Sequence, residues 1–329
     1  MGLSAISAAP TTLTAWALTT GEAGMRTQAR GLAQRVAGEV VEKTVSVRWP
    51  WSWFQAGWRG VLAGVEVKAG GPLAPPWPDL IVSCGRRSSI IAVALKQAAG
   101  GRPIIAHVQD PLTDPARFDL VVAMAHDPVQ GPNVLRVLTA LHDMTPERLA
   151  AGAVAWKPQF EHLPRPVVGV LLGGPTRGSD FDADEARALD ARLAALHGKI
   201  GGSVVIVPSR RTPPAALAVF DAAAADNPAS WVWDGAGDNP YVGVLALSDR
   251  LVVTGDSVSM VSEALATPHP VEVFAEDLRK RHAGFIDDLV DHGLVRIFDG
   301  EAHPPQPRPV VDATRDAAEV LRRLLAERA

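Results

Sequence analysis

The residues best suited to chemistry lie at 249–274, where a short β-branched run ends in a polar turn and apolar residues follow at helical spacing. The turn itself, Thr-Gly-Asp-Ser at 254–257, has residue types that cap helices. A strand, a helix and a second strand in this order leave unpaired N–H groups and the positive helix end at the carboxyl end of the first strand. The stretch therefore predicts an anion-binding turn, to which we assign Asp256, Ser257, Ser259 and Met260.

Glu263 lies one turn into the expected helix, on the same side as Ser259 and Ser262. Neither Ser257 nor Ser259 is followed three residues later by Glu or Gln, so a capping box does not account for Glu263. Its carboxylate could accept hydrogen bonds from the hydroxyls of a ribose. The plainer alternative is an ordinary Asp/Ser helix cap followed by a solvated Glu, and spacing alone favours that alternative.

Two further polar turns follow buried strands in the second half of the chain, after residues 167–172 and 203–207. Three neighbouring turns of this kind on one sheet edge suit a diphosphate, although turns between strands and helices commonly have this composition. Apart from these three turns, the segment Asn-Pro-Tyr at 239–241 opens the helix that precedes residue 249. The candidate ligand-binding residues in these segments are Gly173, Gly174, Thr176, Arg177, Ser209, Arg210, Arg211, Asn239 and Tyr241.

The first half contains a comparable turn after the strand expected at 79–84. Arg86, Arg87 and Ser88 open the following helix and are candidates for a second anion site. Polar side chains also follow three other expected strands. A general base could come from any of these, and the sequence does not choose among Glu22, Asp110 and His126.

Several classes of site are not indicated. The glycine clusters match neither a dinucleotide fingerprint nor a Walker loop, and the nine histidines form no pair with metal-ligand spacing. Cys84 is the only cysteine, which fits a reducing compartment and excludes an intrachain disulfide. The net charge of −4 provides no basic field for nucleic acid. We therefore expect no metal, no cofactor and no nucleic-acid partner.

Strand and helix patterns alternate throughout the 329 residues. This alternation predicts an α/β protein with parallel sheets in two similar halves, each Rossmann-like. The proline-bounded segment 157–166 is the expected boundary. We expect an N-terminal domain at 1–160 and a C-terminal domain at 161–329, with the amphipathic last helix able to pack back on the first domain.

Aromatic residues concentrate at 49–54 and at Trp58. They could insert into a bilayer interface or hold a lipid acceptor, but such a cluster is more often a small core under a loop. The first residues lack the basic region of a signal peptide, and no apolar run reaches the roughly 20 residues that a membrane span requires. A cytoplasmic protein is expected, with any membrane contact peripheral.

Taken together, these motifs resemble the ELM family, named for a plant mitochondrial-fission factor, over nearly the whole chain. The family usually has Thr-Asp-Gly where this chain has Thr-Thr-Gly at 19–21, so the resemblance supplies no carboxylate there. The matching segments are 16–28, 78–88, 109–111, 126–133, Gly-Gly-Pro at 173–175, Ser-Arg-Arg-Thr-Pro at 209–213, Asn-Pro-Tyr at 239–241 and Asp-Ser-Val-Ser-Met-Val-Ser-Glu-Ala at 256–264.

More distantly, the second half is similar to the donor domain of GT-B glycosyltransferases. That resemblance implies two domains facing a cleft, a donor diphosphate at Gly173 to Arg177, and a ribose at Glu263. Our leading hypothesis is a protein that binds a nucleotide-diphosphate sugar and transfers the sugar, without a metal, to a lipid or glycan acceptor of the cell envelope. The alternative is a non-catalytic adaptor that keeps the fold and recruits a partner.

Overall fold

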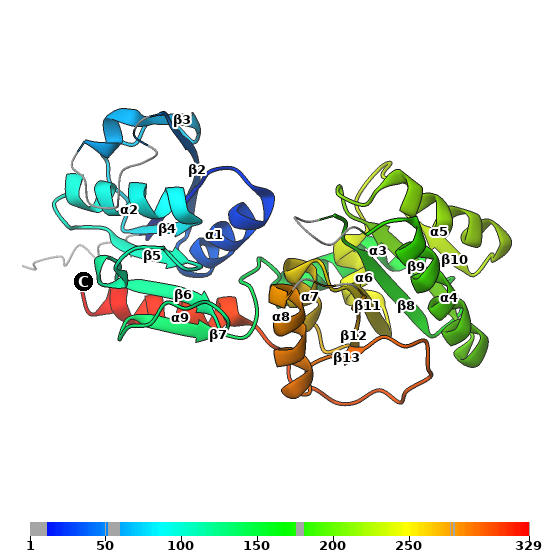
Figure 1. Ribbon diagram of the computed structural model, residues 1–329. Helices are drawn as coiled ribbons and strands as arrows, with labels where there is room; N and C mark the ends of the chain where they lie inside the picture. Colours follow the sequence, from blue (N-terminus) through cyan, green and yellow to red (C-terminus); the bar gives the residue numbers. More distant parts are fainter. Residues whose placement is uncertain are drawn as a thin grey trace, which may run out of the picture. The chain divides into compact units, whose positions relative to one another are not determined.

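The computed structural model describes residues 12–49, 51, 60–175, 181–276, 278 and 280–328, without the side chains of residues 226, 280 and 281 (Figure 1). The chain forms two compact α/β units. The first comprises residues 1–143 and 313–329, and the second comprises residues 144–312. Each unit has its own sheet, as expected for two domains.

The first unit contains a seven-stranded sheet in the order β3-β2-β1-β4-β5-β6-β7. Every neighbouring pair is parallel except β2 with β3. Strands β4 and β5 are buried along their whole length, because helices cover both faces of the sheet. The strands are β1 (Thr14–Thr19), β2 (Glu39–Val47), β3 (Val65–Ala69), β4 (Leu80–Cys84), β5 (Ile104–Val108), β6 (Leu120–Met124) and β7 (Val134–Val137).

Three α-helices cover this sheet: α1 (Ala23–Val36), α2 (Arg86–Ala98) and α9 (Ala313–Ala326). Helices α1 and α9 share one hydrophobic core, in which Leu32 and Leu321 are fully buried, and α2 packs on the opposite face (Figure 1). The Thr314 hydroxyl accepts from the His142 amide over 2.8 Å and donates to the His142 carbonyl over 2.9 Å, which anchors the start of α9. Short 3₁₀ turns occur at Val61–Gly64 and Pro115–Arg117.

The second unit contains a six-stranded, fully parallel sheet in the order β10-β9-β8-β11-β12-β13. In this doubly wound order the chain reverses its direction of progress between β8 and β11, which are neighbours. The strands are β8 (Val167–Leu172), β9 (Ser203–Pro208), β10 (Ser230–Val232), β11 (Arg250–Thr254), β12 (Val271–Phe274) and β13 (Arg296–Ile297). The helices are α3 (Pro146–Phe160), α4 (Ala183–Ile200), α5 (Pro214–Asp226), α6 (Tyr241–Leu247), α7 (Val258–Leu265) and α8 (Lys280–Asp291).

The fold class is therefore the expected one, α/β with two Rossmann-like sheets dominated by parallel pairs. The division of the chain differs from the expected one at 160/161, because α3 packs on α6 of the second unit. Helices α3 and α6 pack closely because each has a glycine at the contact. A Cβ on Gly152 would lie 2.5 Å from Val242 Cγ1, and one on Gly243 would lie 2.4 Å from Trp156 Cγ. The unit boundary consequently precedes α3, and α9 counts with the first unit.

Candidate functional site

The turn after β8 is hydrogen-bonded to the turn after β11, at the point where the strand order of the second unit reverses. The Gly173 N–H donates to Thr254 Oγ1 over 2.7 Å, and the Gly174 N–H donates to Asp256 Oδ2 over 2.9 Å. The carboxyl ends of β8 and β11 thus bring together glycines and a carboxylate that the sequence had assigned to one site.

Glycine is required at both positions by close approach of other groups. A Cβ on Gly173 would lie 2.2 Å from Asp256 Oδ2, and a Cβ on Gly174 would lie 2.3 Å from the Arg211 carbonyl oxygen. Real Cβ atoms essentially never approach other atoms this closely. The two glycines therefore allow the neighbouring turns to pack on this one.

The turn after β9 completes the cluster. Ser209 Oγ donates to the Gly173 carbonyl over 2.7 Å, and Thr212 Oγ1 donates to the same oxygen over 2.5 Å. The Arg211 guanidinium donates to the Gly174 carbonyl over 3.0 Å and lies 3.4 Å from Asp256 Oδ2. Arg210 and Arg211 are both exposed at this edge. The three predicted turns are thus one hydrogen-bonded unit.

Asp256 occupies the centre of this cluster and is 5% exposed. Its Oδ2 accepts from Gly174 and Arg211, whereas its Oδ1 is buried and has no hydrogen-bond partner among the residues that the structure describes. The two amides that the glycine turn was expected to offer to a phosphate therefore already have acceptors within the protein. An anion that enters here meets a carboxylate as well as the Arg211 guanidinium.

Helix α7 begins beside this cluster and carries Glu263. Its N-cap is Ser257, whose Oγ accepts from the Met260 amide over 3.4 Å. Glu263 is 8% exposed and accepts a hydrogen bond from the Tyr241 hydroxyl at the start of α6. The alternative of a solvated Glu is therefore wrong, because the carboxylate is buried and hydrogen-bonded.

Asn239 and the remaining predicted residues of the second unit have simpler environments. Asn239 Oδ1 accepts from the Tyr241 amide over 2.9 Å and thereby opens α6. Ser259 and Met260 are half-buried in the first turn of α7. Thr176 and Arg177 lie outside the described residues.

In the first unit the strand order reverses between β1 and β4, where the second anion site was expected. Arg86 and Arg87 are exposed there at the start of α2. The Ser88 side chain is buried, and its hydroxyl donates to the Gly85 carbonyl over 2.7 Å. Ser88 thus has a structural hydrogen bond, and the two arginines are the accessible groups.

The three candidate bases lie at the ends of three different strands. Glu22 is exposed and accepts from the Thr20 hydroxyl over 2.5 Å. Asp110 Oδ1 accepts from the Leu112 amide over 2.8 Å, and His126 Nε2 lies 3.9 Å from Asp127 Oδ1. No hydrogen bond joins the three candidates to one another in the described part of the chain.

The aromatic segment is described only in part. Trp49 is 74% exposed, and Trp51 lies against Gly64, where a Cβ would come within 2.2 Å of the Trp51 Cγ. Residues 52–59 fall outside the described residues, so the choice between a small core and a lipid contact stays open. Among the described helices, none has the length and hydropathy of a membrane span.

Two buried polar groups in the first unit escaped the sequence analysis. His107 on β5 is fully buried, its Nδ1 lies 2.8 Å from Ser83 Oγ, and burial lowers the pKa of His107 to about 3. Lys43 on β2 donates to the Gly71 and Pro72 carbonyls, and burial lowers its pKa. A titratable residue inside an otherwise apolar strand was the available signal for His107, whereas β2 also contains Glu39 and Glu42 and gave no such signal for Lys43. Within the described ranges no group of three His, Cys, Asp or Glu side chains is placed to hold a metal.

Comparison with known proteins extends these observations. The sequence profile of the family described as mitochondrial fission ELM1 matches residues 23–324. The mitochondrial fission protein ELM1 of Arabidopsis thaliana is 34% identical over 277 residues, which cover 76% of this chain and 65% of that protein, less than two thirds of its length.

Among solved structures, the UDP-GlcNAc 2-epimerase of Methanocaldococcus jannaschii superimposes with a TM-score of 0.57 at 9% identity, over 95% of this chain and 99% of the epimerase. The structure of that enzyme in complex with UDP-GlcNAc and UDP gives a TM-score of 0.51 at 10% identity, with the same shares of the two chains. At this identity the likeness establishes the fold, which is GT-B-like.

Proposed function

Because the chain belongs to the mitochondrial fission ELM1 family and has a GT-B-like fold, we propose that it binds a nucleotide-diphosphate sugar at the carboxyl edge of the second unit's sheet. The observation that carries the proposal is the convergence of the turns after β8, β9 and β11 where the strand order reverses. In doubly wound sheets, ligands bind outside the carboxyl ends of the strands at this point. The solved epimerase complex contains UDP-GlcNAc and UDP, which supports this class of ligand.

In the proposed complex the nucleotide lies along the start of α7. The buried Glu263 carboxylate accepts from the hydroxyl of the half-buried Tyr241 and also accepts from the ribose hydroxyls. The exposed Arg210 and Arg211 face the diphosphate and neutralise part of its charge. Thr176 and Arg177, next along the chain from the glycine turn, are assigned to the same diphosphate.

The proposed reaction transfers the sugar to a hydroxyl of a cell-envelope acceptor. The acceptor oxygen attacks the anomeric carbon, the bond to the diphosphate breaks, and the acceptor proton passes to a base. The cations at the carboxyl edge stabilise the departing diphosphate in place of a metal. Glu22, Asp110 and His126 remain the candidate bases, and Arg86 and Arg87 could hold an anionic acceptor.

A non-catalytic adaptor is the second candidate, and one observation favours it. Thr254 and Asp256 satisfy the Gly173 and Gly174 amides, so the turn is stable without a ligand. An adaptor would retain this packing as part of its fold and would bind a protein partner elsewhere.

Calorimetric titration of the purified protein with UDP, ADP and their sugar derivatives tests the proposal, together with an assay for release of the free nucleotide. Saturable binding of at least one sugar nucleotide is expected. Turnover in the presence of an acceptor would establish transfer. If no nucleotide binds at millimolar concentration, the nucleotide site is refuted and the adaptor function is favoured.

A further inference from the structure

A cavity of the second unit lies at the opposite end of the sheet from the glycine turn. Its volume is about 470 Å³, within the range of small-molecule sites. Arg250 and Val271, which line it, are the first residues of β11 and β12, whereas Thr254 is the last residue of β11 and Asp256 follows it. Four residues of strand separate the two places by roughly 13 Å. The cavity is therefore distinct from the proposed nucleotide site.

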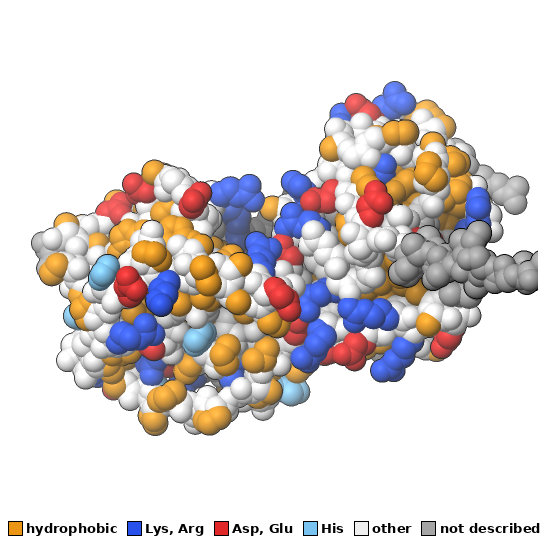
Figure 2. Space-filling model, turned by 180° about the vertical axis from the view of Figure 1, so that it is seen from behind, with side chains coloured by type: hydrophobic (Ala, Val, Ile, Leu, Met, Phe, Trp, Pro, Cys, Tyr) orange, Lys and Arg blue, Asp and Glu red, His pale blue; other side chains and the backbone are white. Residues whose placement is uncertain are grey.

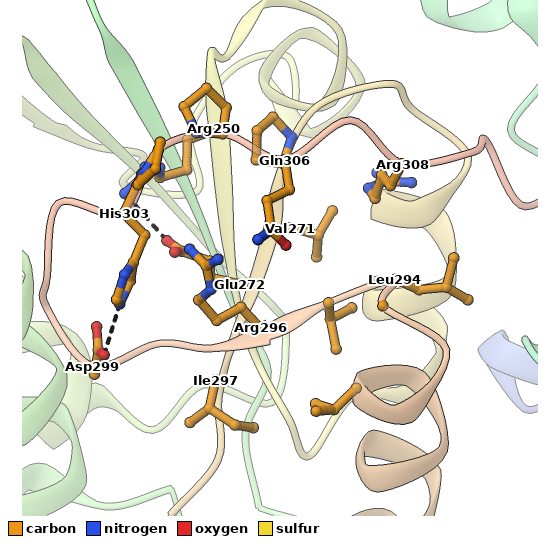
Figure 3. A pocket seen from close by; sticks show the side chains of 16 residues that line it. Arg250, Val271, Glu272, Leu294, Arg296, Ile297, Asp299, His303, Gln306 and Arg308 are labelled. Carbon is orange, nitrogen blue, oxygen red and sulfur yellow. Dashed lines mark hydrogen bonds and ion pairs between the residues drawn. The ribbon is translucent and has the colours of Figure 1, made fainter.

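A buried ion pair forms one wall of this cavity (Figure 3). Arg250 Nη1 lies 3.5 Å from Glu272 Oε2, and the two side chains are 11% and 5% exposed. Burial raises the pKa of the Glu272 carboxyl, and the nearby Arg250, Arg296 and His303 oppose that rise. Removing charges from water is costly unless they are compensated, so a pair in this position indicates a built polar wall.

The wall carries more positive than negative charge. His303 is hydrogen-bonded to Asp299 over 2.9 Å, and Glu272 has Arg250 as its partner. Arg296, on the edge strand β13, has neither a hydrogen bond nor a close ion pair among the described residues, although its charge acts on Glu272. Its guanidinium is therefore available to an anion.

Arg308 adds a second positive charge, and no carboxylate of the described residues pairs with it. Its guanidinium donates to carbonyls at the end of α7 and just beyond it, including those of Ala264, Leu265 and Thr267. These carbonyls occupy N–H donors of the guanidinium but are neutral, so its positive charge is not compensated. Burial lowers the pKa of Arg308 to about 10. The field inside the cavity consequently favours a negative ligand.

Apolar side chains also line the cavity. Val271, Leu294 and Val295 are buried in it, whereas Val290 and Ile297 are 38% and 40% exposed. The Gln306 side chain points from the proline-rich segment toward Val271 and Glu272 (Figure 3). On the face shown in Figure 2, acidic and basic side chains are interspersed. The cavity thus combines a cationic wall with exposed aliphatic surface.

We propose that this cavity binds a small amphiphilic anion, a carboxylate or phosphate monoester with an aliphatic body. Its head group pairs with Arg296 and accepts from the Gln306 amide. Its aliphatic body covers Val290 and Ile297, which are left exposed in the protein alone.

Calorimetry with octyl phosphate below its micellar concentration tests the proposal, with inorganic phosphate as the head group alone. We expect one molecule of octyl phosphate to bind per chain, at least about tenfold more tightly than phosphate, because the aliphatic body leaves water. Arg296→Gln should weaken binding about tenfold or more through loss of a charge-assisted contact. Ile297→Ser should weaken the binding of octyl phosphate but leave the affinity for inorganic phosphate unchanged.

Arg323→Gln provides the matched control, since Arg323 is an exposed arginine on α9 of the other unit. The Arg323→Gln and Arg296→Gln variants should both unfold at the same temperature as the parent protein. Absence of saturable octyl phosphate binding to the parent would overturn the proposal, and so would equal weakening by the two arginine variants. Vesicles bearing an anionic phospholipid form a second arm. Binding of vesicles but not of dissolved octyl phosphate would assign this face to a membrane surface and also overturn the proposal.

Discussion

The Asp256 carboxylate accepts a hydrogen bond from the Gly174 amide over 2.9 Å, where the glycine turn would otherwise offer that N–H to a phosphate oxygen. The same carboxylate lies 3.4 Å from the Arg211 guanidinium. A negative charge of the protein thus lies at its own anion-attracting turn. A diphosphate must either displace this carboxylate or bind beside it.

Replacing Asp256 by Asn should strengthen the binding of pyrophosphate and UDP. At about 5 Å and an effective dielectric constant of about 20, two like charges repel by roughly 3 kcal/mol, so a gain of about tenfold or more in affinity is expected. Asn keeps an acceptor for the Gly174 amide. Calorimetry on both proteins measures the change, with the exposed Asp238→Asn as control. Weaker binding by Asp256→Asn would mean that the carboxylate itself contacts the ligand.

Glu263→Ala should weaken nucleotide binding by about 1.5–3 kcal/mol if its carboxylate accepts the ribose hydroxyls. A 2′,3′-dideoxy nucleotide has no such hydroxyls and should bind the variant and the parent almost equally. Tyr241→Phe removes the hydroxyl that donates to Glu263 and should cause a smaller loss. Unchanged affinity of Glu263→Ala for the ribose form would exclude this role.

Gly173→Ala should destabilise the fold by about 1–3 kcal/mol, because the added methyl group would collide with the Asp256 carboxylate. Removing that carboxylate in the double variant Gly173→Ala, Asp256→Gly should recover part of the loss, which chemical denaturation can measure as a coupling energy. Gly198, on α4 with open space around it, is the matched control. Gly198→Ala should raise the free energy of unfolding by about 0.4–1 kcal/mol. If the effects of Gly173→Ala and Asp256→Gly on the free energy of unfolding were additive, the added methyl group would not collide with the Asp256 carboxylate.

Acid should destabilise the first unit through His107. Burial lowers the pKa of His107 to about 3 in the folded protein, whereas the ordinary value is 6.5. Between these values the unfolded chain binds a proton that the folded chain does not, so the free energy of unfolding falls as the pH drops below 6.5. The slope contributed by this group is at most about 1.4 kcal/mol per pH unit.

Denaturation curves at several pH values measure this slope in the parent and in His107→Gln, which does not titrate. The variant should have a shallower slope, although some slope will persist because the pKa of the partly buried His269 is also lowered. The exposed His162→Gln should behave as the parent. Equal slopes in the parent and in His107→Gln would contradict the prediction, because they would mean that the pKa of His107 is the same in the folded and the unfolded chain.

The meeting of the three polar turns in the second unit could be predicted from the sequence, and the reason is topological. Parallel strands end at one edge, so the turns after β8, β9 and β11 had to meet once their strands were recognised. The direction of the Asp256 side chain could not be read in the same way. It depends on how closely Gly173 and Arg211 approach, which is a property of packing and not of spacing.

The unit boundary was placed one helix too late for a related reason. The prolines near residue 160 are a local signal, whereas the attachment of α3 to α6 depends on contacts between Gly152 and Val242 and between Trp156 and Gly243. Small residues at a helix interface produce no hydrophobic period. His107 was missed because a histidine within an apolar strand has the same pattern whether it titrates normally or not.

The return of the chain to its first unit affects how the protein is made. The whole second unit, residues 144–312, lies in sequence between α1 and α9, although Leu32 and Leu321 belong to one core. At about 5–20 residues per second, a ribosome needs roughly 10–30 s to synthesise the intervening unit. During that interval the nascent first unit lacks the helix that covers α1, and its apolar face is open to chaperones. The second unit is continuous in sequence, so it can fold before the first unit is complete.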